Sequence, residues 1–477
     1  MKMKNFILKG HSTVYCLILT LIILAGFGSC KDDVINNSAV PYDPSQPVVI
    51  SDFTPKTGGV GQQLVIYGKN FGDNPDSIHV YIGGIEAVVI GVKDENIYCL
   101  VPSGAYDGNI DIYMGDNPDL IASASEAFGY ERKTVVSTLV GYKDERDDQG
   151  WIDGKFDVAA GFRNPSFMTF DPENSKHLYI SYDFGAGIYL VNFEDSTVTQ
   201  HLSASAGNWD RLRSIDFTLD GQYMIVAQDQ GSVNGVSTSI LSRAKDFKDP
   251  QTLTLSKQCN GAAIHPLTGE MYFNSYEKGQ VYRYDVMNSK TIVGNSGIDS
   301  QDYNLLYLVQ DNGWEFHFHM HPSGNYAYIM VVNQHYILRT DYDWTTKSFS
   351  QPYVVCGESR VGGYLDGVGS KARLRNPYQG VFVKNPDYAG QDDEYDFYFT
   401  EQYNHDIRIL TPQGKVTTFA GRGSTSLDSN AWGYVDGDLR VKARFDQPTG
   451  IAYDSVEKAF YVGDMQNRCI RKIALEQ

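Results

Sequence analysis

The stretch GYVDGDLRVKARFDQPTGIAYD, residues 433–454, is one of three similar segments that decide the fold of this 477-residue chain. The other two are GWIDGKFDVAAGFRNPSFMTFD at 150–171 and GYLDGVGSKARLRNPYQGVFV at 363–383. Each runs from an aromatic-x-Asp-Gly turn through an Ala-containing segment to a Pro that opens an apolar strand. Fixed internal repeats of this kind must be sought before any single motif is interpreted, because they define the architecture.

Three weaker copies lie between the segments at 150–171 and 363–383. They are LRSIDFTLDGQYMIVA (212–227), CNGAAIHPLTGEMYFN (259–274) and EFHFHMHPSGNYAYIM (315–330), each an apolar strand, a turn with Gly and a second strand. Six units result, starting near residues 165, 211, 259, 316, 377 and 448. Repeats with three or four strands each predict the blades of a β-propeller.

The repeats resemble the NHL family, including its Asn-His pair at Asn404-His405, where the last copy has Arg468 in place of the histidine. An outer strand that ends a blade precedes unit five, at PYVVCGE (352–358), and unit six, at KVTTFAGRG (415–423). Unit six itself is not followed by such a strand. TVVSTLVGY at 134–142 matches that strand. We therefore expect residues 134–477 to form a six-bladed ring, with 134–142 completing the last blade and leaving no open edge there.

Residues 47–130 differ in character. PVVISDFTPKTGGVGQQLVIYGKNFG (47–72) and the segment after it show short alternating strands split by Gly, Pro and Asn turns. This pattern predicts a small β-sandwich. The phrase also resembles the IPT/TIG immunoglobulin-like family, whose members serve mostly as spacers or interaction modules. The predicted fold class is therefore all-β: an N-terminal Ig-like sandwich followed by a six-bladed NHL-type propeller.

The N-terminus has a basic start, an apolar run at 14–27 and small residues before Cys30, as a secretory signal does. Gly28-Ser29-Cys30 resembles a bacterial lipobox, and Lys31-Asp32-Asp33 resembles the acidic tag of surface lipoproteins. We expect residues 1–29 to be a signal peptide, Cys30 to be lipidated, and 30–46, rich in Asn, Asp, Ser and Pro, to be a tether. The alternative is an ordinary signal peptide with an incidental cysteine.

The formal net charge is −18, which disfavours nucleic acid or anionic lipid as partners. Membrane attachment is expected through the lipid only. Four cysteines remain after the anchor, without CxxC spacing; they are expected to be small buried residues, although a disulfide is compatible with a location outside the cytoplasm: Cys99, Cys259, Cys356 and Cys469.

Three histidines alternate in DNGWEFHFHMHPSG, residues 311–324, which suggests a metal site on one strand face. The repeat register assigns His321 to a turn, where other units have Asp171, Asn385 and Asp454. His317 and His319 would then need a third ligand such as His335. We therefore expect no cofactor, with a metal ion held by His317, His319 and His335 as the alternative.

Aromatic and polar residues gather in the loops that open on one face of the predicted ring. An aromatic plane can stack on a sugar ring while amides and carboxylates bond its hydroxyl groups. Blade packing is the competing interpretation, above all for Trp151, Tyr364 and Tyr434, which recur in register. The candidate ligand-binding residues are Trp151, Trp209, Trp314, Trp432, Tyr364, Tyr276, Asn333, His335, Gln402 and Tyr403.

The layout of lipid, tether, Ig-like spacer and propeller resembles that of accessory surface glycan-binding proteins of polysaccharide-utilisation systems. The resemblance implies non-catalytic capture of a polysaccharide or oligosaccharide at the outer membrane, facing outward, with an outer-membrane transporter complex as a candidate partner. The first alternative is a propeller lyase or hydrolase that uses His317, His319 and acidic loop residues. The second is a docking component of the uptake complex.

Overall fold

The computed structural model describes residues 41–476, apart from 94, 116, 118, 142–149, 185–186, 230–235, 256–257, 276–278, 287–303, 310–314 and 424–429. The chain divides into two compact units, Met1–Arg132 and Lys133–Gln477. The predicted signal peptide and Cys30 lie outside the described residues. In the described part, no helix is both long and apolar enough to cross a membrane.

The first unit is an antiparallel seven-stranded sheet in the order β1-β3-β6-β5-β4-β7-β8, together with a parallel β2–β9 pair. Strands β4 and β7 alternate buried and half-buried residues, because one face of each meets the core. Ile66, Phe71 and Ile97 are fully buried in that core. The strands are β1 (Val49–Thr54), β2 (Thr57–Gly58), β3 (Gln63–Lys69), β4 (Ile78–Ile82), β5 (Ile85–Lys93), β6 (Asn96–Leu100), β7 (Ile110–Met114), β8 (Ala122–Ser123) and β9 (Gly129–Tyr130).

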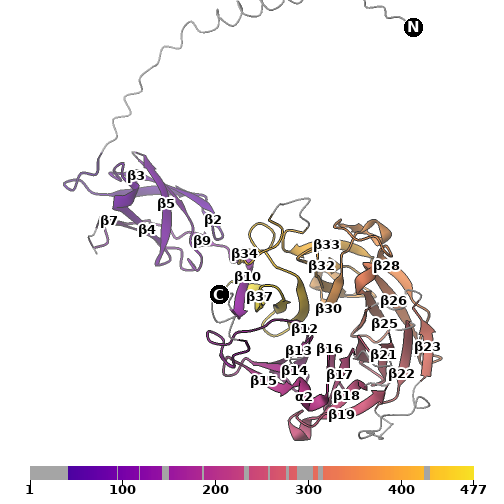
Figure 1. Ribbon diagram of the computed structural model, residues 1–477. Helices are drawn as coiled ribbons and strands as arrows, with labels where there is room; N and C mark the ends of the chain where they lie inside the picture. Colours follow the sequence, from indigo (N-terminus) through magenta and orange to yellow (C-terminus); the bar gives the residue numbers. More distant parts are fainter. Residues whose placement is uncertain are drawn as a thin grey trace, which may run out of the picture. The chain divides into compact units, whose positions relative to one another are not determined.

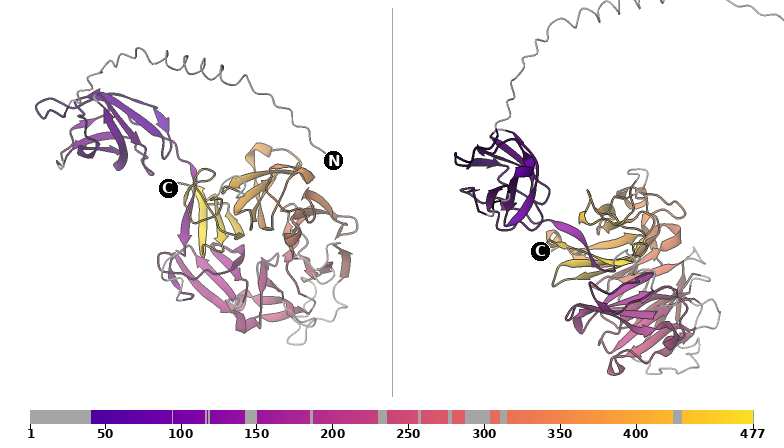
Figure 2. Two further views of the ribbon diagram at one scale, coloured as in Figure 1. Left: turned by 45° about the horizontal axis from the view of Figure 1, so that its top comes forward. Right: turned by 60° about the vertical axis from the view of Figure 1, so that its left-hand side comes forward.

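The second unit contains, within its described residues, six antiparallel sheets arranged around a common axis, which are the blades of a propeller (Figure 1; Figure 2, left). The prediction of an all-β chain with an Ig-like domain and a six-bladed propeller is thereby confirmed. The innermost strands, from blade one to blade six, are β12 (Pro165–Asp171), β16 (Leu212–Phe217), β20 (Ala262–Ile264), β24 (Phe316–Met320), β30 (Pro377–Lys384) and β35 (Pro448–Asp454).

The second strands of the blades are buried on both faces, because a neighbouring blade packs on each side. All six residues of β25 in blade four and of β36 in blade six are buried, which removes the alternation seen in the first unit. The second strands are β13 (Asn174–Tyr182), β17 (Tyr223–Gln228), β21 (Met271–Ser275), β25 (Tyr326–Val331), β31 (Tyr395–Glu401) and β36 (Ala459–Asp464).

The third and outer strands complete each blade. The third strands are β14 (Gly187–Asn192), β18 (Val236–Ser242), β22 (Gln280–Tyr284), β26 (Tyr336–Asp343), β32 (Asp406–Leu410) and β37 (Cys469–Leu475). The outer strands are β15 (Thr197–Ser203), β19 (Gln251–Leu255), β23 (Asn304–Leu308), β28 (Tyr353–Gly357), β33 (Lys415–Ala420) and β10 (Thr134–Val140). Short additions are β11 (Gly154–Lys155), β27 (Ser348–Phe349), β29 (Gly367–Val368), β34 (Gly437–Asp438), helix α2 (Ala204–Gly207) and 3₁₀ turns such as Val332–Gln334.

Ring closure depends on β10, which enters the propeller before blade one but belongs to blade six. It pairs antiparallel with β37, from Thr134 opposite Leu475 to Val140 opposite Ile470. Val136 on this strand is buried in the core shared by blades five and six. The first and last strands of the unit therefore share one sheet, and each covers an edge that the other would expose.

The turn that follows each inner strand is fixed by its first side chain. His321 Nδ1 accepts a hydrogen bond from the main-chain N–H of Ser323, and His265 Nδ1 accepts from Thr268. The carboxylate of Asp171 accepts a hydrogen bond from the main-chain N–H of Glu173 in the same way, and the carboxylate of Asp454 accepts one from the main-chain N–H of Val456. The register that made His321 a turn residue therefore holds, since His and Asp perform the same local task.

All four cysteines named above are buried, and none of them forms a disulfide. Burial raises the pKa of the Cys99 and Cys259 thiols to about 12. They are packing residues, as expected, and the disulfide that the sequence left open does not form.

Candidate functional site

A cavity of about 280 Å³ opens on the propeller axis, at the starts of the inner strands. The loops that join second to third strands, at Asp183, Asn333 and Gln402, lie around it. We call it the axial pocket. It is lined by Asn164, Pro165, Ser166, Asp183, Phe184, Glu315, Asn333, Asn376, Tyr378, Gln402, Tyr403, Gln447, Thr449 and Met465.

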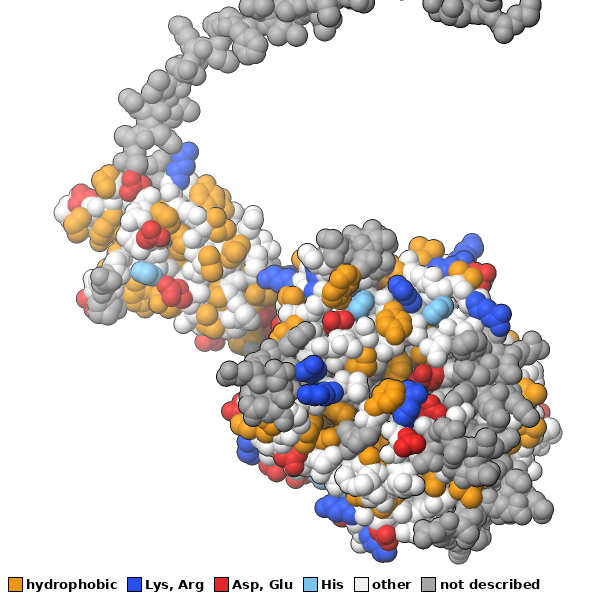
Figure 3. Space-filling view, viewed as in Figure 1, with side chains coloured by type: hydrophobic (Ala, Val, Ile, Leu, Met, Phe, Trp, Pro, Cys, Tyr) orange, Lys and Arg blue, Asp and Glu red, His pale blue; other side chains and the backbone are white. Residues whose placement is uncertain are grey.

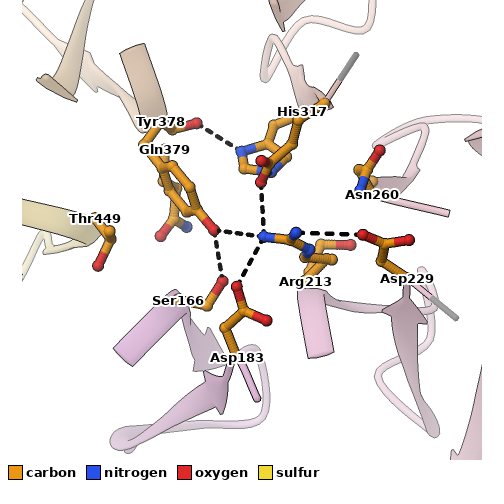
Figure 4. Close-up of polar contacts among 12 residues, drawn as sticks. Ser166, Asp183, Arg213, Asp229, Asn260, His317, Tyr378, Gln379 and Thr449 are labelled. Carbon is orange, nitrogen blue, oxygen red and sulfur yellow. Dashed lines mark hydrogen bonds and ion pairs between the residues drawn. The ribbon is translucent and has the colours of Figure 1, made fainter. Parts of the chain in front are cut away.

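The floor of the axial pocket is organised by Arg213 at the start of β16 (Figure 4). Its Nη1 donates to Glu315 Oε1 at 2.8 Å, to Asp183 Oδ2 at 3.0 Å and to Tyr378 Oη at 3.2 Å. Its Nη2 donates to Asp229 Oδ2 at 3.3 Å. Arg213 is buried, so one guanidinium ties together blades one, two, four and five at the axis.

The charges of this network are mutually compensated. Burial by itself raises the pKa of Glu315, but the charge of Arg213 and the hydrogen bond from His317 outweigh burial and bring it to about 2. Burial also raises the pKa of Tyr378, and the carboxylate of Glu315 raises it further. At neutral pH the floor therefore holds a fixed carboxylate and a neutral phenol.

His317 lies behind Glu315 in the same network. Its Nδ1 is 2.8 Å from the main-chain oxygen of Tyr378, and its Nε2 is 3.0 Å from Glu315 Oε1. Both ring nitrogens therefore lie within hydrogen-bond distance of an oxygen of the protein. His317 thus supports Glu315, and both of its ring nitrogens are engaged within the protein.

Two aromatic rings stand at the rim of the axial pocket. Phe184 is 64% exposed and has the guanidinium of Arg211 over its ring at 4.2 Å. Tyr403 is 41% exposed, and Arg375 lies 5.9 Å from its ring centroid. The propeller face seen in Figure 3 also mixes hydrophobic, basic and acidic side chains near its centre, without one broad patch of a single charge.

Amide groups lie between the rim and the floor. Asn376 Nδ2 donates to Asn333 Oδ1 at 3.1 Å, which joins blades four and five. Gln402 and Gln447 line the same wall. Amides offer both donors and acceptors, so this wall suits a ligand with several hydroxyl groups.

Three of the predicted candidates meet in the axial pocket: Asn333, Gln402 and Tyr403. His335 lies just outside, where its Nδ1 accepts a hydrogen bond from the main-chain N–H of Asn376. His405 makes the equivalent bond to Gln447 one blade further on. His335 therefore links blades four and five through a hydrogen bond that recurs one blade further on, and this bond positions Asn376.

Other candidates do not reach the axial pocket. Trp209 is only 4% exposed, belongs to the core of blades one and two, and donates its Nε1–H to Ser239. Stacking on a ligand is thus excluded for it in this conformation, and the expectation is corrected. Trp314 and Tyr276 lie outside the described residues. Trp432 is 46% exposed, packs beside His405 and does not line the axial pocket.

The recurring aromatics Trp151, Tyr364 and Tyr434 pack within and between blades. The Trp151 ring lies 4.0 Å from that of Tyr189, centroid to centroid. Tyr364 lies over the guanidinium of Arg408, as Tyr434 does over that of Arg471. The packing interpretation therefore accounts for all three better than ligand binding.

The alternating histidines do not converge on a metal site. His317 is engaged in the floor, His321 is a turn residue, and His319 stacks on Phe167 at 5.7 Å. Across the described residues, no group of three or more His, Cys, Asp or Glu side chains could hold a metal ion. The metal alternative finds no support in this geometry.

Sequence reasoning missed Arg213, Asp183, Glu315, Tyr378 and Phe184. One signal was present: two cations, Arg211 and Arg213, lie at the start of an inner strand. Two cations at the start of a buried strand indicate acidic partners nearby. The identity of those partners could not be inferred, because Glu315 lies 102 positions away along the chain.

The fold and the axial pocket define a class: a propeller with a ligand-sized polar cavity on its axis, preceded by an immunoglobulin-like domain. The IPT/TIG domain family matches residues 47–130. NHL repeat-containing protein 2 of Homo sapiens is 29% identical over 115 residues, 24% of this chain and 14% of that protein. The chain thus spans about a seventh of the length of that curated relative.

Two solved structures match nearly the whole chain. An auxiliary nutrient binding protein from Bacteroides thetaiotaomicron is 45% identical, with a TM-score of 0.83, and the match covers 92% of this chain and 100% of that one. Another, from Bacteroides ovatus, is 36% identical with a TM-score of 0.68 and the same coverage. The chain belongs to the same family as these proteins. A further B. thetaiotaomicron structure, 44% identical over 92% of this chain and 99% of its own, with a TM-score of 0.79, is provisionally described as a phosphatase.

Proposed function

We propose that this protein is a surface-anchored binding protein that captures a carbohydrate nutrient in the axial pocket without cleaving it. The observation that carries this proposal is the pairing of exposed Phe184 and Tyr403 with an amide-lined wall above a charge-compensated floor. An aromatic face packs against the apolar face of a sugar ring. Amides and carboxylates orient its hydroxyl groups. The nutrient-binding description of two relatives supports the proposal.

Glu315, the carboxylate nearest the centre of the floor network, is poorly suited to act as a general acid. A glycosidase needs a carboxylic acid that stays protonated near neutral pH beside a second, ionised carboxylate. Glu315 has a pKa of about 2 and accepts from both Arg213 and His317, so it holds no proton to donate. Burial is the largest influence on Asp229 and raises its pKa, although Arg211 and Arg213 both donate hydrogen bonds to it.

Binding is tested by affinity electrophoresis and calorimetry against a polysaccharide panel. Tyr403→Ala and Phe184→Ala should each weaken binding about tenfold or more, because central aromatic contacts dominate such interfaces. Trp344→Ala is the matched control, since it removes an aromatic residue that is equally exposed (46%) and bonds to Asn325 at the other end of blade four, and it should leave the affinity unchanged. New reducing ends or unsaturated products during incubation would contradict a non-catalytic role.

The anchor and the location belong to the same proposal. The lipobox-like Gly28-Ser29-Cys30 supports a lipid on Cys30, and the acidic residues after it support export to the cell surface. Cys30→Ala should abolish labelling with a fatty-acid analogue and release the protein from outer-membrane fractions. Protease shaving of intact cells should remove the wild-type protein. We further propose that it delivers its ligand to an outer-membrane transporter, which co-purification after cross-linking would test.

A further inference from the structure

A cavity of about 550 Å³ lies in the Ig-like unit, on the face of its sheet that points away from the core. Strands β4, β5 and β7 lie side by side there, so alternate residues of each strand face the cavity. We call it the sheet groove. It is lined by His79, Tyr81, Gly84, Glu86, Asp111, Tyr113, Gly115 and Asn117.

Two tyrosines form the aromatic part of the sheet groove. Tyr81 on β4 and Tyr113 on β7 meet edge to face, with ring centroids 5.2 Å apart and ring planes at 77°. Both side chains are half-buried, so each ring packs on the sheet and still faces solvent. The face of an aromatic ring carries partial negative charge and attracts a cation placed over it.

Two carboxylates lie beside these rings. Across the strand pairs, Tyr81 is directly opposite Asp111 on one side and Glu86 on the other. Asp111 Oδ1 accepts a hydrogen bond from Ser123 Oγ at 2.5 Å. Glu86 Oε1 lies 2.8 Å from His79 Nδ1. Among the described residues, the second oxygen of each carboxylate has no hydrogen-bond partner, and no Lys or Arg lines the groove.

The propeller of the same chain shows what such a combination of side chains binds. In three places an arginine guanidinium lies over a tyrosine ring, 3.8 to 5.3 Å from its centroid, and also donates to a nearby aspartate at 2.5 to 2.8 Å. Tyr81 and Asp111 provide the same two groups on an accessible face. The three sets are Arg339 with Tyr326 and Asp341, Arg408 with Tyr364 and Asp366, and Arg471 with Tyr434 and Asp436.

We propose that the sheet groove binds an arginine side chain of a partner protein, with the guanidinium over Tyr81 and bonded to Asp111. The groove lies open on a sheet face, so a side chain that projects from a protein surface can enter it. Arginine is favoured over lysine, because its planar guanidinium stacks on a ring while it donates in fixed directions to carboxylates. The inference is independent of carbohydrate capture in the axial pocket.

The probes are three peptides, Ac-Gly-Ser-Gly-Xaa-Gly-Ser-Gly-NH2, in which Xaa is arginine, citrulline or lysine. Citrulline keeps the planar shape of arginine without its charge. Ligand-observed NMR titrations on the full mature chain should show the arginine peptide binding about tenfold more tightly than the citrulline peptide. The lysine peptide should bind about threefold more weakly than the arginine peptide.

Variants of the groove locate the binding site. Tyr81→Ala and Asp111→Asn should each abolish the preference for arginine over citrulline, whereas Tyr81→Phe, which keeps the ring, should retain it. Tyr98→Ala is the matched control, because it removes a tyrosine of the same unit that is 41% exposed and does not line the groove. Asp73→Asn is the control for charge, since Asp73 is exposed and lies outside the groove lining. Circular dichroism establishes that each variant is folded.

Equal affinities of the arginine and citrulline peptides for the unaltered protein would overturn the proposal. So would a preference that survives both Tyr81→Ala and Asp111→Asn, or one that is lost equally in Asp73→Asn. A polysaccharide whose binding is lost in Tyr81→Ala and is not displaced by the arginine peptide would make the groove a carbohydrate site instead. The peptide comparison on the unaltered protein requires no variant, so the test survives a substitution that fails to fold.

Discussion

Arg213 is the residue on which the floor of the axial pocket depends. Removing one partner of a buried ion network is costly, because the remaining charges lose their compensation without regaining water. Asp183, Asp229 and Glu315 would be left with Arg211, whose side chain is 32% exposed. The network is therefore expected to contribute to stability and to ligand orientation together.

Arg213→Met should lower the free energy of unfolding by about 3–5 kcal/mol at pH 7. Arg211→Met is the matched control and should cost about 1 kcal/mol or less, because its partly exposed pairs are screened by solvent. Urea titrations followed by tryptophan fluorescence measure both values. Equal, small losses for the two variants would show that the network is not needed for folding.

Two buried carboxylates, Asp216 and Asp464, should make the protein lose stability as pH rises. Burial is the largest influence on each and raises its pKa to about 6. A raised pKa means that the folded state holds its proton more tightly than the unfolded state, whose carboxyl titrates near 4. Stability is then fully present below about pH 4 and is lost as pH rises through 6. Glu315, with its lowered pKa, acts oppositely below about pH 4.

Asp216→Asn should therefore reduce the slope of unfolding free energy against pH between 4 and 6, by up to about 1.4 kcal/mol per pH unit. The absolute stability will also change, since both Asp216 oxygens accept main-chain hydrogen bonds, so the slope is the informative quantity. Urea titrations at several pH values measure it. An unchanged slope would mean that Asp216 does not titrate in this range.

Among the elements, β10 shows that the sequence repeat can predict the position of a strand in the ring. The sequence identified the strand from its likeness to the outer strands of blades four and five. It also indicated the turn role of His321, because local side-chain bonds recur in every blade. Blade position can be predicted in this way, since each repeat supplies the same strands in the same order. Contacts that differ from blade to blade cannot.

Val136→Asp should destabilise the propeller by several kcal/mol, because it places a charge in the buried core next to β37. Thr134→Asp, at the exposed start of the same strand, is the matched control and should change stability little. Thermal unfolding by calorimetry compares the two variants. Similar melting temperatures would indicate that β10 adds little to ring closure.

At the scale of the whole molecule, the chain consists of two units with separate cores. A fragment beginning at Lys133 retains β10 and should unfold cooperatively and bind the glycan with the affinity of the full chain. A fragment beginning ten residues later lacks β10 and should aggregate or unfold without a sharp transition. Calorimetry and the glycan titration test both fragments. Full affinity in the shorter one would contradict the role of β10 in closure.

The sequence by itself determined the all-β class, the six repeats, the strand that closes the ring, and three residues of the axial pocket: Asn333, Gln402 and Tyr403. Periodicity and turn chemistry are local, so they can be recognised without coordinates. Only the tertiary structure joined Arg213 to Glu315 and Tyr378, 102 and 165 positions apart. It likewise buried Trp209, and it gave each of the three alternating histidines a different set of contacts. Ring closure brings residues of different blades to the axis, and the residues that meet there have no common signal along the chain.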